Sequence, residues 1–192
     1  MFARTERLLL RPSWSEDAPA LAQAIGDEAI VRNLATAPWP YGAGDAQAFV
    51  AARRRPEETS LLVFRRTRGA AQLIGGVGLG RGPDGETEIG FWISRPHWGL
   101  GYATEAAAAM VALARDSLRL KRLAASHFLD NPASGRVLEK IGFRTSDIIE
   151  PRYSAGRGGA APAKLYTLAF AGEAAEAQQA FAQACGDRMI AA

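Results

Sequence analysis

The amino-acid sequence has very few side chains that form disulfides or bind metals. Its 192 residues include one cysteine, Cys185, and two histidines, His97 and His127. A single cysteine has no disulfide partner within the chain, and two histidines are too few for a convincing zinc site. We therefore expect no disulfide framework, no metal centre and a reducing compartment, the cytoplasm.

Long apolar runs and blocks of one charge are also missing. No stretch approaches the ~20 apolar residues of a membrane-spanning helix, and the first residues do not resemble a signal peptide. The 23 Lys and Arg residues only just outnumber the 20 Asp and Glu residues, which gives a net charge of +3. The densest basic cluster, 53–55, lacks the interleaved aromatic residues of a base-stacking surface. These features predict neither a membrane partner nor a nucleic-acid partner.

The length and the composition, 48% hydrophobic and 22% charged, are typical of one globular domain. We predict an α/β domain over residues 1–171 and a C-terminal helical tail over 172–192. Apolar runs, alternation and turn residues predict strands at 6–12, 60–66, 72–79, 86–94, 123–128 and 164–170. Helical periodicity predicts helices at 16–25, 45–54, 104–118, 132–141 and 173–184. This order of elements predicts a central mixed sheet with helices on both faces.

Local signals mark the ends of these elements. The expected helix caps, whose side-chain oxygens accept free N–H groups of a first turn, are Ser13 or Ser15, Asp45 and Asn131. The glycines between 75 and 80 weaken the strand that contains them and permit close approach of a ligand or another backbone. The segment 153–163, rich in Gly, Ala and Pro, is predicted to be a mobile loop.

The segment WGLGYAT, residues 98–104, lies between a predicted strand and a long predicted helix. Its two glycines let the backbone turn tightly, and the helix start presents free N–H groups and a partial positive charge. Such a turn is typical of a pyrophosphate-binding site, although a plain strand-to-helix turn has the same pattern. It lacks the Walker lysine and the Gly-x-Gly-x-x-Gly of the Rossmann fold. Taken alone, the segment leaves both interpretations open.

Three further segments surround this turn: TERLLLRP at 5–12, EIGFWI at 88–93 and NPASGRVLEKIGF at 131–143. Together with WGLGYATEA at 98–106, they resemble the GNAT superfamily of N-acetyltransferases, in particular the branch of ribosomal-protein alanine N-acetyltransferases. One position departs from the superfamily's pattern, which usually begins the turn with Arg or Gln where this sequence has Trp98. Because such a turn binds through backbone amides, we expect binding to survive this change.

The resemblance implies a single-domain GNAT-like fold with a mixed, mostly antiparallel sheet, and acetyl-CoA as co-substrate. It assigns the pyrophosphate of coenzyme A to the turn, whose residues are Trp98, Gly99, Leu100, Gly101, Tyr102, Ala103 and Thr104. The strand edge near Trp92 and Ile93 would pair with the amides of the pantetheine arm. Asn131, Ser134 and Arg136 map to a second coenzyme-binding segment. Their alternative roles are a helix cap, a solvated serine and a surface charge.

The reaction that the resemblance implies is direct attack of a neutral amine on the thioester carbonyl, without a covalent enzyme intermediate. Cys185 lies outside every motif and receives no role. Glu88 is the first candidate for the general base, and Glu150 is the second. Strand alternation places Glu88 on the same face as Gly90 and Trp92, and a solvent-facing role is the alternative for a glutamate on a strand.

Ser134 is the candidate for the acid that meets the leaving thiolate, with Tyr166 and Tyr153 as alternatives. His127 is a further candidate, because histidine is the side chain suited to proton transfer near neutral pH, but a lone histidine on an apolar strand is more often packed.

The amine acceptor is left open by the sequence. The acceptor is a small-molecule amine or a protein N-terminus, such as that of a ribosomal protein. The alternative to an acetyltransferase is a non-catalytic module that binds or senses coenzyme A. Trp39 and Tyr41, in a turn-rich segment, either line a substrate pocket or cover the edge of the core. A monomer or a homodimer is expected.

Overall fold

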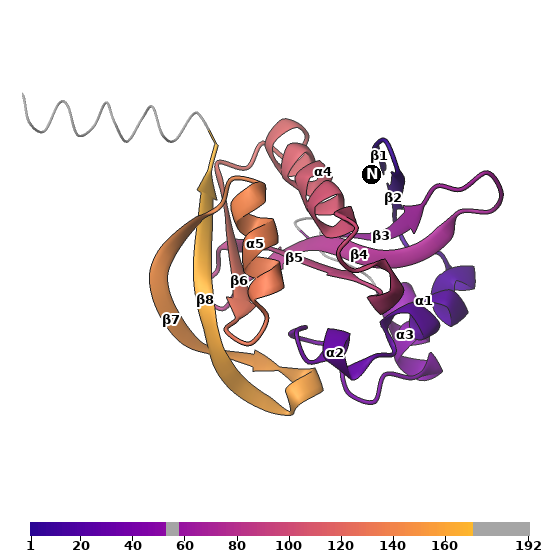
Figure 1. Ribbon diagram of the computed structural model, residues 1–192, viewed down its shortest axis with the longest axis horizontal. Coiled ribbons are helices and arrows are strands. Elements are labelled where there is room, and N and C mark those ends of the chain that lie inside the picture. Colours follow the sequence, from indigo (N-terminus) through magenta and orange to yellow (C-terminus); the bar gives the residue numbers. More distant parts are fainter. Residues whose placement is uncertain (53–57, 171–192) are drawn as a thin grey trace, which may run out of the picture.

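The computed structural model describes residues 1–52 and 58–170 (Figure 1). Within these residues the strands form one eight-stranded sheet in the order β1-β2-β3-β4-β5-β6-β8-β7. The β5–β6 pair is parallel, and the other neighbours are antiparallel. The strands are β1 (Ala3–Arg4), β2 (Leu8–Arg11), β3 (Thr59–Arg65), β4 (Gln72–Arg81), β5 (Thr87–Ile93), β6 (Arg122–Phe128), β7 (Arg144–Ser154) and β8 (Gly159–Ala169). The helices are α1 (Ala18–Ile25), α2 (Glu28–Val31), α3 (Ala43–Ala51), α4 (Tyr102–Asp116) and α5 (Pro132–Lys140).

Helices cover both faces of the sheet. The sequence of β3 explains why, because its apolar side chains point to both faces. Leu61 and Val63 belong to the apolar cluster beneath α4 and α5, whereas Leu62 and Phe64 belong to the cluster beneath α1, α2 and α3. Successive side chains of a strand point to opposite faces, so a continuous apolar run needs cover on both. The two groups of helices accordingly lie on opposite sides of β3 and β4 (Figure 1). The predicted mixed sheet with helices on both faces is confirmed.

The prediction of a mobile loop at 153–163 is wrong. This segment holds the end of β7, a short 3-10 turn and the start of β8, and none of the predicted strands corresponds to β7. The buried hydroxyl of Ser154 lies 2.8 Å from the carbonyl oxygen of Leu34 and 3.1 Å from that of Arg32. A side chain at Gly156 would collide with the backbone of Val31. The small residues therefore allow the hairpin to pack tightly against the end of α2.

The predicted cap of the first helix is also wrong. Neither Ser13 nor Ser15 caps it, and Asp17 instead accepts the N–H of Trp14 at 2.7 Å. The same carboxylate forms a two-pronged ion pair with Arg11, with both N···O distances at 2.7 Å. Asp17 thus joins the end of β2 to the start of the first helical segment.

The other two predicted caps differ in detail. The helix α3 begins at Ala43, and Asp45 sits in its first turn, where it accepts the N–H of Gly42 at 2.8 Å. Asn131 occupies the position before α5, but its side chain makes no capping hydrogen bond.

Three predicted features lie outside the described residues: the C-terminal tail at 172–192, the basic cluster at 53–55 and the last residues of the predicted second helix.

The parallel strands β5 and β6 pair at a single register position, Glu88 opposite Ala124. Farther along, toward Ile93 and Phe128, the two strands have no paired residues. The connection between them contains α4, as expected for a parallel crossover. One edge of the second half of β5 is consequently left without a neighbouring strand. In residues 1–52 and 58–170, no helix is long and apolar enough to cross a membrane.

Candidate active site

The turn before α4 has the geometry of an anion cradle. Gly99 and Gly101 adopt positive φ angles of 74° and 80°, a region in which glycine is favoured because it has no Cβ. Gly101 has no side chain to cap α4, which begins at Tyr102. The first-turn amides of a helix have no carbonyl partner within it, so the N–H groups of Tyr102, Ala103 and Thr104 are available to an anion.

The N-terminal segment clamps this cradle through Glu105. The carboxylate accepts hydrogen bonds from the hydroxyl of Thr5 at 2.5 Å, from the backbone N–H of Arg7 at 2.9 Å and from its Nε at 2.7 Å. The guanidinium of Arg7 also donates to the carbonyl of Leu100 at 2.9 Å and lies over the ring of Tyr102. Burial raises the pKa of Glu105, but the hydrogen bonds from Thr5 and Arg7 outweigh it and hold that pKa below its ordinary value. The link explains why TERLLLRP and WGLGYATEA occur together.

Trp98, which stands where the superfamily usually has Arg or Gln, ties the cradle to the end of β5. Its indole Nε1 donates to the carbonyl of Ile93 at 2.6 Å. Between them, the hydroxyl of Ser94 lies 2.9 Å from Nδ1 of His97. Burial and the nearby charge of Arg65 lower the pKa of His97, which favours the neutral imidazole.

A cavity of about 350 Å³ lies beside the cradle. Of the residues predicted to bind coenzyme A, all but Leu100 line it: Trp92, Ile93, Trp98, Gly99, Gly101, Tyr102, Ala103, Thr104, Asn131, Ser134 and Arg136. Leu100 is half exposed and contributes its carbonyl to Arg7 instead. The lining also includes His97 and Lys140, which sequence reasoning did not assign. We call this cavity the cradle cavity.

The side chains of Asn131 and Ser134 meet in the cradle cavity. The amide Nδ2 of Asn131 donates to the hydroxyl oxygen of Ser134 at 3.0 Å. Because the oxygen of Ser134 accepts this bond, its own hydrogen is free to point to another acceptor. Arg136 and Lys140, four residues or about one turn apart on α5, also line this cavity and add positive charge to it.

The two residues predicted to pair with the pantetheine arm, Trp92 and Ile93, direct their backbone N–H and C=O groups to opposite edges of β5. The N–H of Ser94 donates to the carbonyl of Ile74 in β4. In an antiparallel pair, alternate residues turn their N–H and C=O groups to the partner, so Trp92 directs these groups toward β4. Phe91 and Ile93 direct theirs to the opposite edge, which has no neighbouring strand there. Since Trp98 occupies the carbonyl of Ile93, Phe91 is the residue with both backbone groups open to a ligand.

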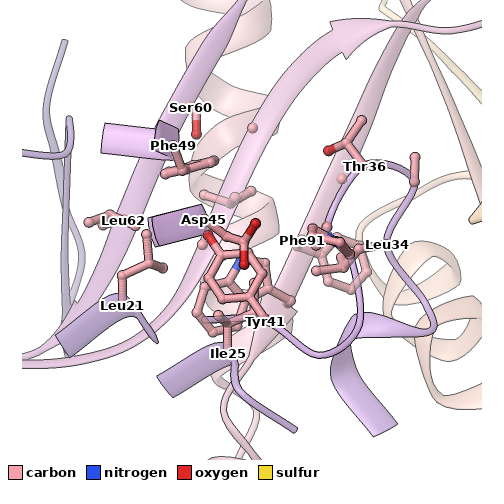
Figure 2. A pocket seen from close by; sticks show the side chains of 18 of the residues that line it. Leu21, Ile25, Leu34, Thr36, Tyr41, Asp45, Phe49, Ser60, Leu62 and Phe91 are labelled. Atoms are coloured by element: carbon pink, nitrogen blue, oxygen red, sulfur yellow. The ribbon is translucent and has the colours of Figure 1, made fainter. Parts of the chain in front are cut away.

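A second cavity, of about 420 Å³, opens against the face of the sheet that α1 and α3 cover (Figure 2). It shares Leu34, Phe91 and Trp92 with the cradle cavity. Of the two aromatic residues predicted to reach a substrate pocket, Tyr41 lines this cavity and Trp39 does not. Asp45, which sequence analysis treated as a helix cap only, lines it too. We call it the acceptor-side cavity.

The two candidate bases share one guanidinium and lie outside both linings. Glu88 accepts a hydrogen bond from the hydroxyl of Ser126 at 2.6 Å and lies 3.9 Å from Nη1 of Arg152. Glu150 pairs with Nη2 of Arg152 at 2.9 Å. Glu88 is two residues from Gly90, which lines the acceptor-side cavity, and alternation puts both on one face of β5.

The alternative acids lie away from both cavities. Tyr166 is buried, and its hydroxyl oxygen lies 3.3 Å from Nε2 of His127 and 3.4 Å from a carboxylate oxygen of Glu139. Burial, followed by the charge of Glu139, raises the pKa of Tyr166. Tyr153 is 62% exposed on β7. Of the three candidate acids, Ser134 lines the cradle cavity, and Tyr153 and Tyr166 line neither of these two cavities.

Comparison with known proteins agrees with this geometry. Residues 7–144 match the family model of the acetyltransferase (GNAT) domain. YoaA of Bacillus subtilis, an uncharacterised N-acetyltransferase, is 28% identical over 156 residues, which are 76% of this chain and 84% of that protein. A GNAT-family acetyltransferase of Bacillus anthracis has a TM-score of 0.73 at 24% identity, covering 88% of this chain and 98% of that one. RimL, a ribosomal α-N-protein acetyltransferase solved with coenzyme A, has a TM-score of 0.71 at 19% identity, with the same coverage. The chain therefore belongs to the GNAT family of acetyltransferases and is an N-acetyltransferase.

Proposed function

We propose that the protein transfers the acetyl group of acetyl-CoA to a small-molecule primary amine by direct attack. The observation that carries this proposal is the position of β5 between two cavities. The cradle and its free amides lie in one cavity, an apolar chamber with a carboxylate is the other, and both are lined by Phe91 and Trp92. Two substrates that enter from opposite sides meet at this strand.

Acetyl-CoA fits the cradle cavity for three reasons. Its pyrophosphate matches the free first-turn amides of Tyr102, Ala103 and Thr104, and Arg136 and Lys140 add positive charge nearby. Its pantetheine amides match the open backbone groups of Phe91. The pantetheine arm then leads the thioester toward Ser134 on the facing wall.

Direct attack requires two proton transfers, and the chain has a candidate for each. The amine nitrogen forms a bond to the thioester carbonyl carbon, and the carbon–sulfur bond breaks. The hydroxyl of Ser134, whose hydrogen is freed by the bond from Asn131, donates that hydrogen to the departing thiolate and regains a proton from solvent water. Glu88 takes the proton from the amine through water, because its carboxylate lies outside the cavity lining but on the acceptor face of β5.

The size of the acceptor-side cavity favours a small molecule over a protein N-terminus. A volume of about 420 Å³ is typical of a small-ligand pocket. The acceptor of the neighbour RimL, a ribosomal protein, is a property of that enzyme, and at 19% identity the likeness concerns the fold.

The test is to mix the purified protein with acetyl-CoA and a panel of amines and N-terminal peptides, and to follow release of free thiol. We expect thiol release above the hydrolysis background with amines. Calorimetry with acetyl-CoA alone measures binding separately. Binding without turnover on any acceptor would favour the non-catalytic coenzyme A module, and no binding at all would contradict the assignment of the cradle.

A further inference from the structure

The floor of the acceptor-side cavity is bare backbone. Gly78 of β4 and Gly90 of β5 are direct cross-strand partners, and both line the cavity. A Cβ at Gly90 would have no atom within 4 Å, so the space above this residue is open. At Gly76, one pleat along the same face, the indole of Trp92 already fills the space. At Gly78 a Cβ would lie 2.7 Å from the carbonyl oxygen of Thr59, so the open part of the floor, on which a planar or branched group can lie, is the backbone at Gly90.

The walls of this cavity are mostly apolar, and the hydroxyl side chains of Thr36 and Ser60 also line it. Leu21 and Ile25 of α1, Phe49 of α3 and Leu62 of β3 surround the floor (Figure 2). Leu34, from the segment after α2, closes the side next to the cradle cavity. A ligand that fits these walls gains by burying an apolar body.

One charge faces this apolar space. Asp45 is the only Asp, Glu, Lys or Arg among the described residues of the lining. Its Oδ2 accepts the N–H of Gly42, and within the described chain its Oδ1 has no hydrogen-bond partner. Tyr41 lies beside it (Figure 2), and burial together with the charge of Asp45 raises the pKa of Tyr41, which keeps this phenol neutral. The carboxylate attracts an ammonium group and repels another carboxylate.

We infer that the acceptor-side cavity selects a small primary amine that carries one flat or branched apolar body and no carboxylate, with Asp45 as the group that binds its ammonium form. The inference rests on the proposed function and names its substrate class. At ~30 Å³ for each water-sized unit, 420 Å³ holds about 14 such units, enough for an arylalkylamine. Polyamines lack the apolar body, and free amino acids bring a carboxylate next to Asp45.

The first test compares four acceptors at saturating acetyl-CoA: 2-phenylethylamine, ethylamine, phenylalanine and spermidine. We expect kcat/KM for 2-phenylethylamine to exceed that for ethylamine roughly 10- to 100-fold, the effect of burying one aromatic side chain. Phenylalanine and spermidine should also be acetylated at least about 10-fold less efficiently, because of carboxylate repulsion and the missing apolar body respectively.

Two variants test the roles proposed for Asp45 and Gly90. Asp45→Asn keeps an oxygen for Gly42 but removes the charge, and it should raise KM for 2-phenylethylamine roughly 10- to 100-fold while KM for acetyl-CoA stays unchanged. Gly90→Val fills the floor and should remove the preference for the ring. The matched controls are Asp116→Asn, an exposed carboxylate on α4, and Gly159→Ala, a glycine of β8 with open space around it. Both controls should leave the kinetics unchanged.

The outcomes separate this inference from the proposed function. If spermidine, phenylalanine or ethylamine is acetylated as efficiently as 2-phenylethylamine, the substrate class is wrong while acetyl transfer stands. If Asp45→Asn leaves KM for the amine unchanged, its role in binding is wrong. If no amine or peptide releases thiol although acetyl-CoA binds, the proposed function fails and the inference fails with it.

Discussion

Replacing Glu105 by glutamine tests whether the N-terminal segment holds the coenzyme cradle. The glutamine oxygen still accepts hydrogen bonds from Thr5 and from the backbone of Arg7, but as a neutral acceptor, which weakens them by about 1 kcal/mol in total. The ion pair with Arg7 adds only ~0.5 kcal/mol, because the arginine side chain is 43% exposed and solvent screens the pair. The expected loss of unfolding free energy is about 1.5 kcal/mol, or roughly 3–6 °C in Tm for a chain of this size.

The lowered pKa of Glu105 determines how the loss of stability in this variant changes with pH. Because the pKa of Glu105 is lower in the folded protein than its ordinary value of 4.5, the stabilisation is present in full above that value. It is lost as the pH falls through the lowered pKa. The glutamine variant does not titrate, so the difference in Tm from the unchanged protein should be full at pH 7 and shrink well below pH 4.5.

Thermal melts at neutral and acidic pH, together with calorimetric titration of acetyl-CoA, measure both effects. Weaker clamping should lower the affinity for acetyl-CoA several-fold, since Arg7 also holds the carbonyl of Leu100. The matched control is Glu6→Gln, an exposed carboxylate between the two clamp residues. An unchanged Tm and affinity at pH 7, or a difference in Tm that persists undiminished in acid, would refute the reasoning.

Three further predictions concern single residues. Asp17→Asn leaves the buried guanidinium of Arg11 without its counter-charge and should cost about 3–5 kcal/mol in urea unfolding, whereas a loss below 1 kcal/mol would contradict a buried pair. Gly101→Ala places a Cβ at φ 80° and 3.4 Å from Arg7, so the affinity for acetyl-CoA in calorimetry should fall about tenfold or more. Ser134→Ala should lower kcat roughly 10²-fold and leave KM for acetyl-CoA nearly unchanged, and an unchanged kcat would remove its role as acid.

The cradle could be predicted from sequence because its signals are local. Two glycines, a helix start and the residues that follow occupy consecutive positions, and their backbone conformation depends little on distant contacts. The run of apolar residues in β3 likewise predicted a strand, and the structure adds that both of its faces are covered. The role of Glu105 could not be found in this way, because its partners Thr5 and Arg7 are about a hundred positions away in the chain.

The strand β7 was not predicted because its signals are not local, whereas most of the second half of β8 was predicted as the strand at 164–170. Ile148 and Ile149 are neighbours and both are about half exposed, so β7 lacks the alternation that marks a half-buried strand. Its register also shifts between Thr145 and Ile149. The strand is stabilised by backbone pairing with β8 and by the contacts of Ser154 with the segment after α2. Neither signal is visible in the local sequence.

The acceptor-side cavity could not be predicted because it is assembled from α1, α3, the segment after α2 and three strands, with two to six residues from each. The glycines of β4 were noticed, but their use depends on facing Gly90 across the ladder.

The alternation of β5 links the two cavities. Gly90 has no side chain to cover the backbone toward the acceptor-side cavity. The next residue, Phe91, turns its backbone N–H and C=O groups to the free edge of β5 beside the cradle cavity. A shift of one residue in the register would exchange these roles and put the ring of Phe91 over the acceptor floor. The proposed function gives the order Gly-Phe-Trp within EIGFWI a geometric reason: in that proposal Gly90 faces the amine and Phe91 pairs with the acyl donor, while the indole of Trp92 covers Gly76 at the end of the floor. Gly90→Val should consequently impair use of the amine while acetyl-CoA binding in calorimetry is retained, because the valine side chain points to one cavity only.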